Sequence, residues 1–197
     1  MIEFFKRNKK VLIISLILFL VCAIGAGIYS YCSVGDDYGS ISNAFYQKAN
    51  NGTINQTNDL TYNSDTIGLL LHNIIADFIL IACGFLFSIF SILIAIFNSV
   101  TIGIPFGADL TYSMVTIFPH GIFEYTALVF ALACAFNITK LEIKIIKNRS
   151  FRNTLMDHKR ELKDILIMCG IVFILLVIAA IIECNIVPYF AHWYYGV

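Results

Sequence analysis

Long apolar runs constrain this chain more than any other feature. Residues 11–31, VLIISLILFLVCAIGAGIYSY, contain no charged side chain, and about 20 apolar residues suffice for a helix to cross a bilayer. Only 13% of the residues are charged and the mean hydropathy is +0.81, whereas soluble domains carry about 25% charged residues. A soluble core cannot bury so much apolar surface, so the sequence predicts an all-α integral membrane bundle.

The apolar segments predict five transmembrane helices within a single membrane domain, 1–197. They lie at about 11–31, 67–87, 89–106, 119–138 and 165–184. The first follows a basic flank, as a secretory signal would, but no A-x-A-like site follows it, so we expect a retained helix. The second and third come from one apolar run that is too long for one crossing at about 1.5 Å per residue, so a turn is expected near residues 88–91.

The lysines and arginines predict the orientation of these helices. Four of the thirteen precede residue 11, eight lie in the basic stretch 139–164, and the remaining one is Lys48. Loops rich in Lys and Arg stay in the cytoplasm, which predicts a multi-pass cell-membrane protein with its N-terminus and loop 139–164 in the cytoplasm. Loop 32–65 and the C-terminus would then lie outside, where Asn51 and Asn55 would be glycosylation acceptors.

Seven polar side chains interrupt the apolar segments and form the predicted site. They are His72, Asn73, Asp77, Asn98, His120, Glu124 and Glu183. An ionised carboxylate at mid-bilayer costs about 2.5–3.5 kcal/mol, and no lysine or arginine lies deep in these segments. We therefore expect the three acids to be hydrogen-bonded within a buried cluster, bound to a metal ion, or in contact with water.

Spacing brings some of these residues onto common helix faces. His120 and Glu124 are four residues apart, as are Asn73 and Asp77, and such pairs lie on one face of a helix. Pro119 is typical of a first helical turn, which predicts that His120 lies near the start of its helix. The cluster is therefore expected in the outer half of the membrane.

Small residues at four-residue intervals predict close helix packing. Ser99, Gly103 and Gly107 form one such ridge, and Ala23 and Gly27 form another. Ridges of this kind let helix backbones approach closely in membranes. A homodimer could form through the first ridge.

Motifs of known enzymes are absent. The sequence has no HExxH, GxSxG or P-loop motif, and its six cysteines do not show zinc-site spacing. No cofactor is predicted, and an enzyme is not favoured. His120, Glu124 and Glu183 could still bind a metal ion, with His72 or Asp77 as alternative ligands. The zero net charge gives no reason to predict a nucleic-acid partner.

The sequence PHGIFE (119–124) resembles the hallmark of the stage II sporulation protein M family of integral membrane proteins. HNIIADF (72–78), FNSVTIG (97–103) and AAIIECNIVP (179–188) are similar to other motifs of that family. The resemblance implies that His120, Glu124, Glu183, Asn98 and Asn73 occupy motif positions, whereas His72 and Asp77 are proposed from the residues alone.

The same resemblance implies a scaffold or assembly role in the cell envelope. The member that gives the family its name is a scaffold for cell-wall hydrolases during forespore engulfment. We therefore expect the lipid bilayer and other membrane or envelope proteins as partners. Two alternatives follow from the residues: a small transporter or channel that uses the His/carboxylate cluster for protons or cations, and an intramembrane metal-dependent hydrolase.

Overall fold

A computed structural model describes residues 2–34, 66–148, 156–187, 189 and 190. Within these residues all regular structure is helical, which confirms the predicted all-α class. The helices are α1 (Ile2–Val34), α3 (Thr66–Ala82), the 3-10 turn η2 (Cys83–Leu86), α4 (Ile89–Ala108), α5 (Leu110–Tyr112), the π-helical turn η3 (Ser113–Ile117), α6 (Phe118–Asn148) and α8 (Lys159–Asn185). Among the described residues, four helices are long and apolar enough to span a membrane, and Leu70–Leu86 forms a shorter apolar helix.

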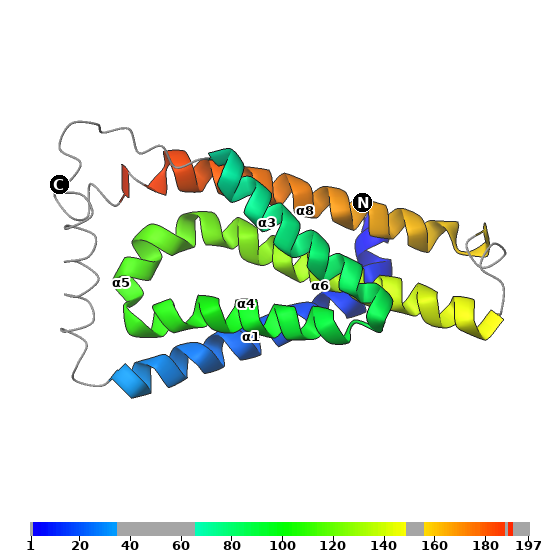
Figure 1. Ribbon diagram of the computed structural model, residues 1–197, viewed down its shortest axis with the longest axis horizontal. Coiled ribbons are helices and arrows are strands. Elements are labelled where there is room, and N and C mark those ends of the chain that lie inside the picture. Colours follow the sequence, from blue (N-terminus) through cyan, green and yellow to red (C-terminus); the bar gives the residue numbers. More distant parts are fainter. Residues whose placement is uncertain (1, 35–65, 149–155, 188, 191–197) are drawn as a thin grey trace.

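The helices run side by side along the long axis of the molecule (Figure 1). Helix α1 packs along α4, α6 packs along α8, and α3 contacts both α6 and α8. Helix α6 is central because it also contacts α1 and α4. Its alanines Ala127, Ala131 and Ala135 are fully buried, and their four-residue spacing gives α6 a narrow face against which neighbouring helices pack closely.

Both basic segments belong to the same end of the bundle, because the side chains of Arg7 and Asp164 are joined by two hydrogen bonds. Both neighbouring helices continue into the predicted basic loop 139–164, since α6 continues to Asn148 and α8 begins at Lys159. Likewise α1 begins at Ile2, not near residue 11. These extra turns form because neither basic stretch contains Gly or Pro, and Lys144 binds Glu161 at 2.5 Å. Residues 35–65, with Lys48, Asn51 and Asn55, lie outside the described residues.

The turn between α3 and α4 follows η2 and lies at Phe87 and Ser88, which have φ of 53° and 56°. Gly84 allows the turn to pack against α6, because an added Cβ would lie 2.8 Å from the Cα of Ala135. The Thr139 hydroxyl of α6 donates to the Gly84 carbonyl at 2.7 Å and lies 2.6 Å from the Ser88 hydroxyl. A single side chain of α6 therefore holds both ends of this turn.

Thr139→Val should lower the free energy of unfolding by about 2 kcal/mol, since it removes two partly buried hydrogen bonds worth about 1 kcal/mol each. Equilibrium unfolding in mixed detergent micelles would measure the change. Thr101→Val is the matched control, because the exposed Thr101 hydroxyl donates only to the Phe97 carbonyl of its own helix. Equal losses in the two variants would contradict the proposed role of Thr139.

The predicted helix start at Pro119 agrees with the start of α6 at Phe118, but helical backbone precedes it. A continuous helical segment runs from Leu110 to Asn148, so His120 lies almost three turns from its first residue. The π-helical turn η3 lies directly before Phe118 and Pro119. In a π-turn the hydrogen-bonding register is shifted, which accommodates a proline that has no N–H to donate.

The small-residue ridge of α4 packs against α1. Ser99, Gly103 and Gly107 are buried, and a Cβ added to either glycine would collide with the backbone of Ala23 or Gly27. The ridge is therefore filled by a helix of the same chain. Helix α1 of the same chain thus occupies the surface on which the sequence suggested a possible homodimer.

Candidate functional site

Five of the seven predicted site residues lie on facing parts of α3, α6 and α8. Asn73 of α3 donates a hydrogen bond from its Nδ2 to the Oε1 of Glu124 on α6. His120, one turn earlier on α6, has its Nε2 3.9 Å from the Oε2 of Glu183 on α8. The site therefore connects three helices through two polar contacts.

Asp77 completes the group. It lies one turn beyond Asn73 on α3 and is only 6% exposed. Its Oδ2 has no hydrogen-bond partner within the described part of the chain. Glu124 has electrostatic interactions with both Asp77 and Glu183, so the three acids share one region of the bundle. No lysine or arginine among the described residues forms an ion pair with any of them.

The other two predicted residues are placed differently. His72 is exposed, because a residue next to the inward-facing Asn73 is turned by about 100° around the helix. Asn98 is half-buried on α4, and no hydrogen bond within the described ranges joins it to the other six. Neither residue therefore belongs to the contacts that the structure shows.

The described residues contain no group of three His, Cys, Asp or Glu side chains arranged to bind a metal ion. His120 and Glu183 approach each other. Glu124 accepts a hydrogen bond from Asn73 and does not meet the other two side chains at a common point. The chemistry that this arrangement supports directly is hydrogen bonding between helices.

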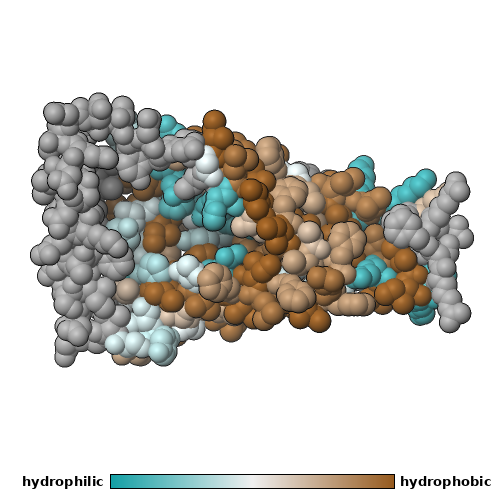
Figure 2. Space-filling model, in the orientation of Figure 1, coloured by the Kyte–Doolittle hydropathy of each residue, from teal (hydrophilic) through white to brown (hydrophobic). Residues whose placement is uncertain are grey.

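Figure 2 shows hydrophilic residues gathered towards both ends of the molecule and an apolar band between them.

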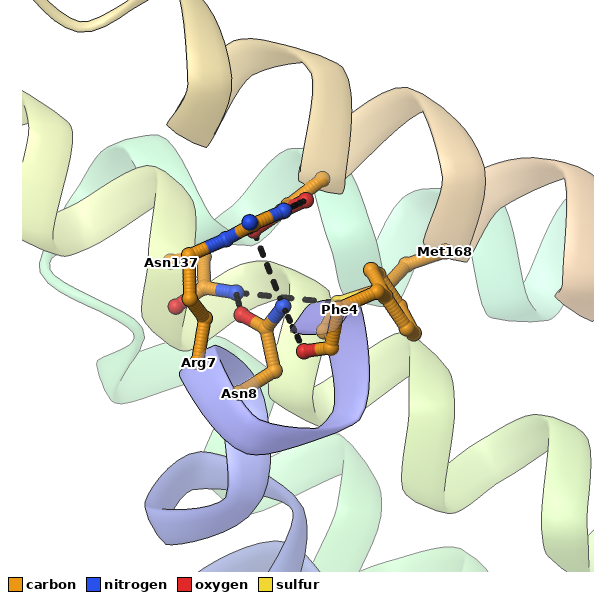
Figure 3. A network of polar contacts seen from close by, with 6 residues as sticks. Phe4, Arg7, Asn8, Asn137 and Met168 are labelled. Atoms are coloured by element: carbon orange, nitrogen blue, oxygen red, sulfur yellow. Dashed lines mark hydrogen bonds and ion pairs between the residues drawn. The ribbon is translucent and has the colours of Figure 1, made fainter. Parts of the chain in front are cut away.

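A second polar network lies at the opposite, basic end and was missed by sequence reasoning (Figure 3). The Nε and Nη2 of Arg7 donate to the two carboxylate oxygens of Asp164 at 2.8 and 2.6 Å. The Nδ2 of Asn8 donates to Asp164 at 3.0 Å and to the Phe4 carbonyl at 3.0 Å. The Nδ2 of Asn137 donates to the Asn8 Oδ1 at 2.8 Å. These contacts join α1, α6 and α8.

Two signals in the sequence could have revealed this network. Asn137 lies near the end of the predicted span 119–138, and a polar residue there needs a partner. Asp164 is the last charged residue before the apolar segment 165–184. Its side chain is only 4% exposed, and a buried carboxylate needs hydrogen-bond donors.

Comparisons with known proteins agree with the resemblance noted in the sequence. The family model Stage II sporulation protein M matches residues 14–188. An uncharacterized protein of Methanocaldococcus jannaschii is 29% identical over 164 residues, which cover 79% of this chain and 89% of that protein. No solved structure matches.

Proposed function

Because the chain belongs to the stage II sporulation protein M family, we propose that it is a scaffold or assembly protein of the cell envelope. One observation carries this proposal. The polar side chains inside the bundle bind one another across helices, at Asn73–Glu124 and at Asn8–Asp164, and these contacts keep the faces of the bundle in fixed positions. A rigid multi-helix body suits a protein that presents surfaces to partners.

The membrane orientation is part of the proposal. The N-terminus and the basic end of the bundle would lie in the cytoplasm, since that end carries most of the cationic side chains. Residues 32–65 and the end of α8 would then face outward. Envelope proteins would bind the outer loop and the lipid-facing helix surfaces, and a homodimer would have to use a surface other than the ridge that α1 covers.

Glu124→Gln tests the scaffold role. A glutamine keeps the oxygen that accepts from Asn73, so we expect the variant to fold and to retain its envelope partners. Photo-crosslinkers placed in residues 32–65 in native cells, followed by mass spectrometry, should yield the same envelope protein at wild-type levels. Glu124→Leu should reduce the yield of both folded protein and cross-link, because it leaves the Asn73 amide unpaired inside the bundle.

Other results would overturn this proposal in favour of a named alternative. Proton or cation flux through proteoliposomes that Glu124→Gln abolishes would indicate a transporter. A stoichiometric metal found by elemental analysis and lost in His120→Ala would indicate a metal site. Cross-links to lipid alone would contradict a scaffold.

A further inference from the structure

An apolar groove of about 420 Å³ lies between α1 and α6. Its walls are formed by residues 12–19 of α1 and 122–130 of α6. Ile13 and Ile122 are 42% and 47% exposed, so the groove opens towards the surroundings of the bundle. The Thr126 hydroxyl in the wall donates to the Ile122 carbonyl of its own helix, which leaves an almost wholly hydrocarbon surface.

The groove is directed towards the basic end of the bundle. The two helices are antiparallel here, since the Phe19 and Tyr125 rings lie 5.6 Å apart and Asn8 bonds to Asn137 at 2.8 Å. Moving along α1 from Phe19 to Leu12 therefore leads towards Lys10, Lys9 and the polar network around Asn8. From residue 19 to residue 12 the wall extends about 10 Å at 1.5 Å per residue.

Lysines follow the groove at this end. Lys10 precedes Ile13 by three residues and is therefore its neighbour on the surface of α1, and Lys140 follows Val129 by eleven residues, three turns along α6. Lys10 lies two residues after Asn8 and Lys140 lies three residues after Asn137, and the 2.8 Å bond between Asn8 and Asn137 brings these parts of α1 and α6 together.

The two cations, Lys10 and Lys140, have no ion-pair partner among the described residues. Glu161, the acid that interacts with Lys140, is already bound to Lys144 at 2.5 Å. Two like charges held close together favour an anion between them.

We propose that this groove binds one hydrocarbon chain of an anionic phospholipid, whose phosphate is held by Lys10 and Lys140. Its volume lies within the range of about 300–1,000 Å³ that is usual for ligand sites. Basic pockets between transmembrane helices recognise anionic headgroups. A zwitterionic lipid would fill the same hydrocarbon surface but would gain less from the lysines, so headgroup charge sets the selectivity.

The experiment compares phosphatidylglycerol with phosphatidylcholine of identical acyl chains, added to the full chain in mild detergent. Native mass spectrometry and thermal unfolding would report binding. We expect phosphatidylglycerol to bind about tenfold more tightly, and Lys10→Gln/Lys140→Gln to reduce its binding to the level of phosphatidylcholine. The matched charge control, Lys147→Gln/Lys159→Gln, removes two exposed lysines elsewhere and should leave the preference unchanged.

A second arm separates the groove from simple surface charge. Ile13→Trp fills the groove and should weaken the binding of both lipids at least fivefold. Ile174→Trp, on the exposed surface of α8, should leave the binding unchanged. Phosphatidylglycerol with a photoactivatable acyl chain should label residues 12–19 and 122–130 of the wild-type protein, which tests the site even if Ile13→Trp does not fold. Equal binding of the two lipids, labelling elsewhere, or a dimer cross-linked through Ile13 would overturn the proposal.

Discussion

Gly103→Leu should destabilise the protein more than any other single substitution considered, by about 3 kcal/mol or more, because overpacking a close contact costs about 1–3 kcal/mol and occasionally more. The reason is geometric. A Cβ at Gly103 would collide with the carbonyl of Ala23, and a Cβ at Gly107 would collide with the carbonyl of Gly27. These obstacles are backbone atoms, which cannot rotate away as a side-chain tip would, so α1 must separate from α4.

Unfolding in mixed micelles and the rate of proteolysis within α1 would measure this effect. Gly25→Leu is the control: Gly25 lies on α1 two residues before Gly27, and an added Cβ meets nothing within 4 Å. We expect Gly25→Leu to stay within about 0.5 kcal/mol of the wild type, as surface substitutions do. A Gly103→Leu variant as stable as Gly25→Leu would show that α1 and α4 do not pack as described.

Asn8→Leu should produce the second large effect, a loss of about 3 kcal/mol. Asn8 is 5% exposed and uses both ends of its amide, donating to Phe4 and Asp164 and accepting from Asn137. A leucine of similar size removes all three bonds. Asp164 Oδ2 then keeps only the Nε of Arg7, and the Asn137 amide keeps only the Met168 sulfur. Three lost hydrogen bonds of about 1 kcal/mol each account for the expected loss.

The control for Asn8→Leu is Asn185→Leu. Asn185 is exposed and its amide donates only to the Ile181 carbonyl of its own helix, so we expect a change below about 1 kcal/mol. A double variant, Asn8→Leu/Asn137→Leu, should lose less than the sum of the single variants, because the two residues share one bond. Additive losses would show that Asn8 and Asn137 act independently.

The sequence predicts those parts of the fold whose length is set by the thickness of the hydrocarbon layer. The lengths of the apolar runs predict which segments cross the membrane. They report only the part of each helix that lies in hydrocarbon, and they do not report where the helix begins or ends. That is why α1 and α6 continue into basic residues where a loop was expected. The π-helical turn before Pro119 has no signal in composition, since it depends on how α5 and α6 join.

The site was predictable only within a single helix. The four-residue spacing of His120 and Glu124 fixes their common face, but which helices approach that face depends on the topology. Of two adjacent residues on α3, Asn73 faces α6 and His72 faces outward, and spacing alone does not distinguish them. Asn8 lay outside every predicted span, so a search limited to the spans could not find it.

The pairing of α1 with α4 has a consequence for biosynthesis. Between Gly27 and its neighbour Gly107 lie a long hydrophilic stretch, all of α3 and most of α4. Helix α1 therefore leaves the ribosome and enters the bilayer well before α4 has been synthesised. Until then, the small residues Ala23 and Gly27 of α1 are in contact with lipid. In the two-stage view, individual helices insert first and associate afterwards. The packing of α1 against α4 then forms only after α4 has been inserted. An N-terminal fragment that ends before α4 should accordingly be the form most exposed to membrane proteases.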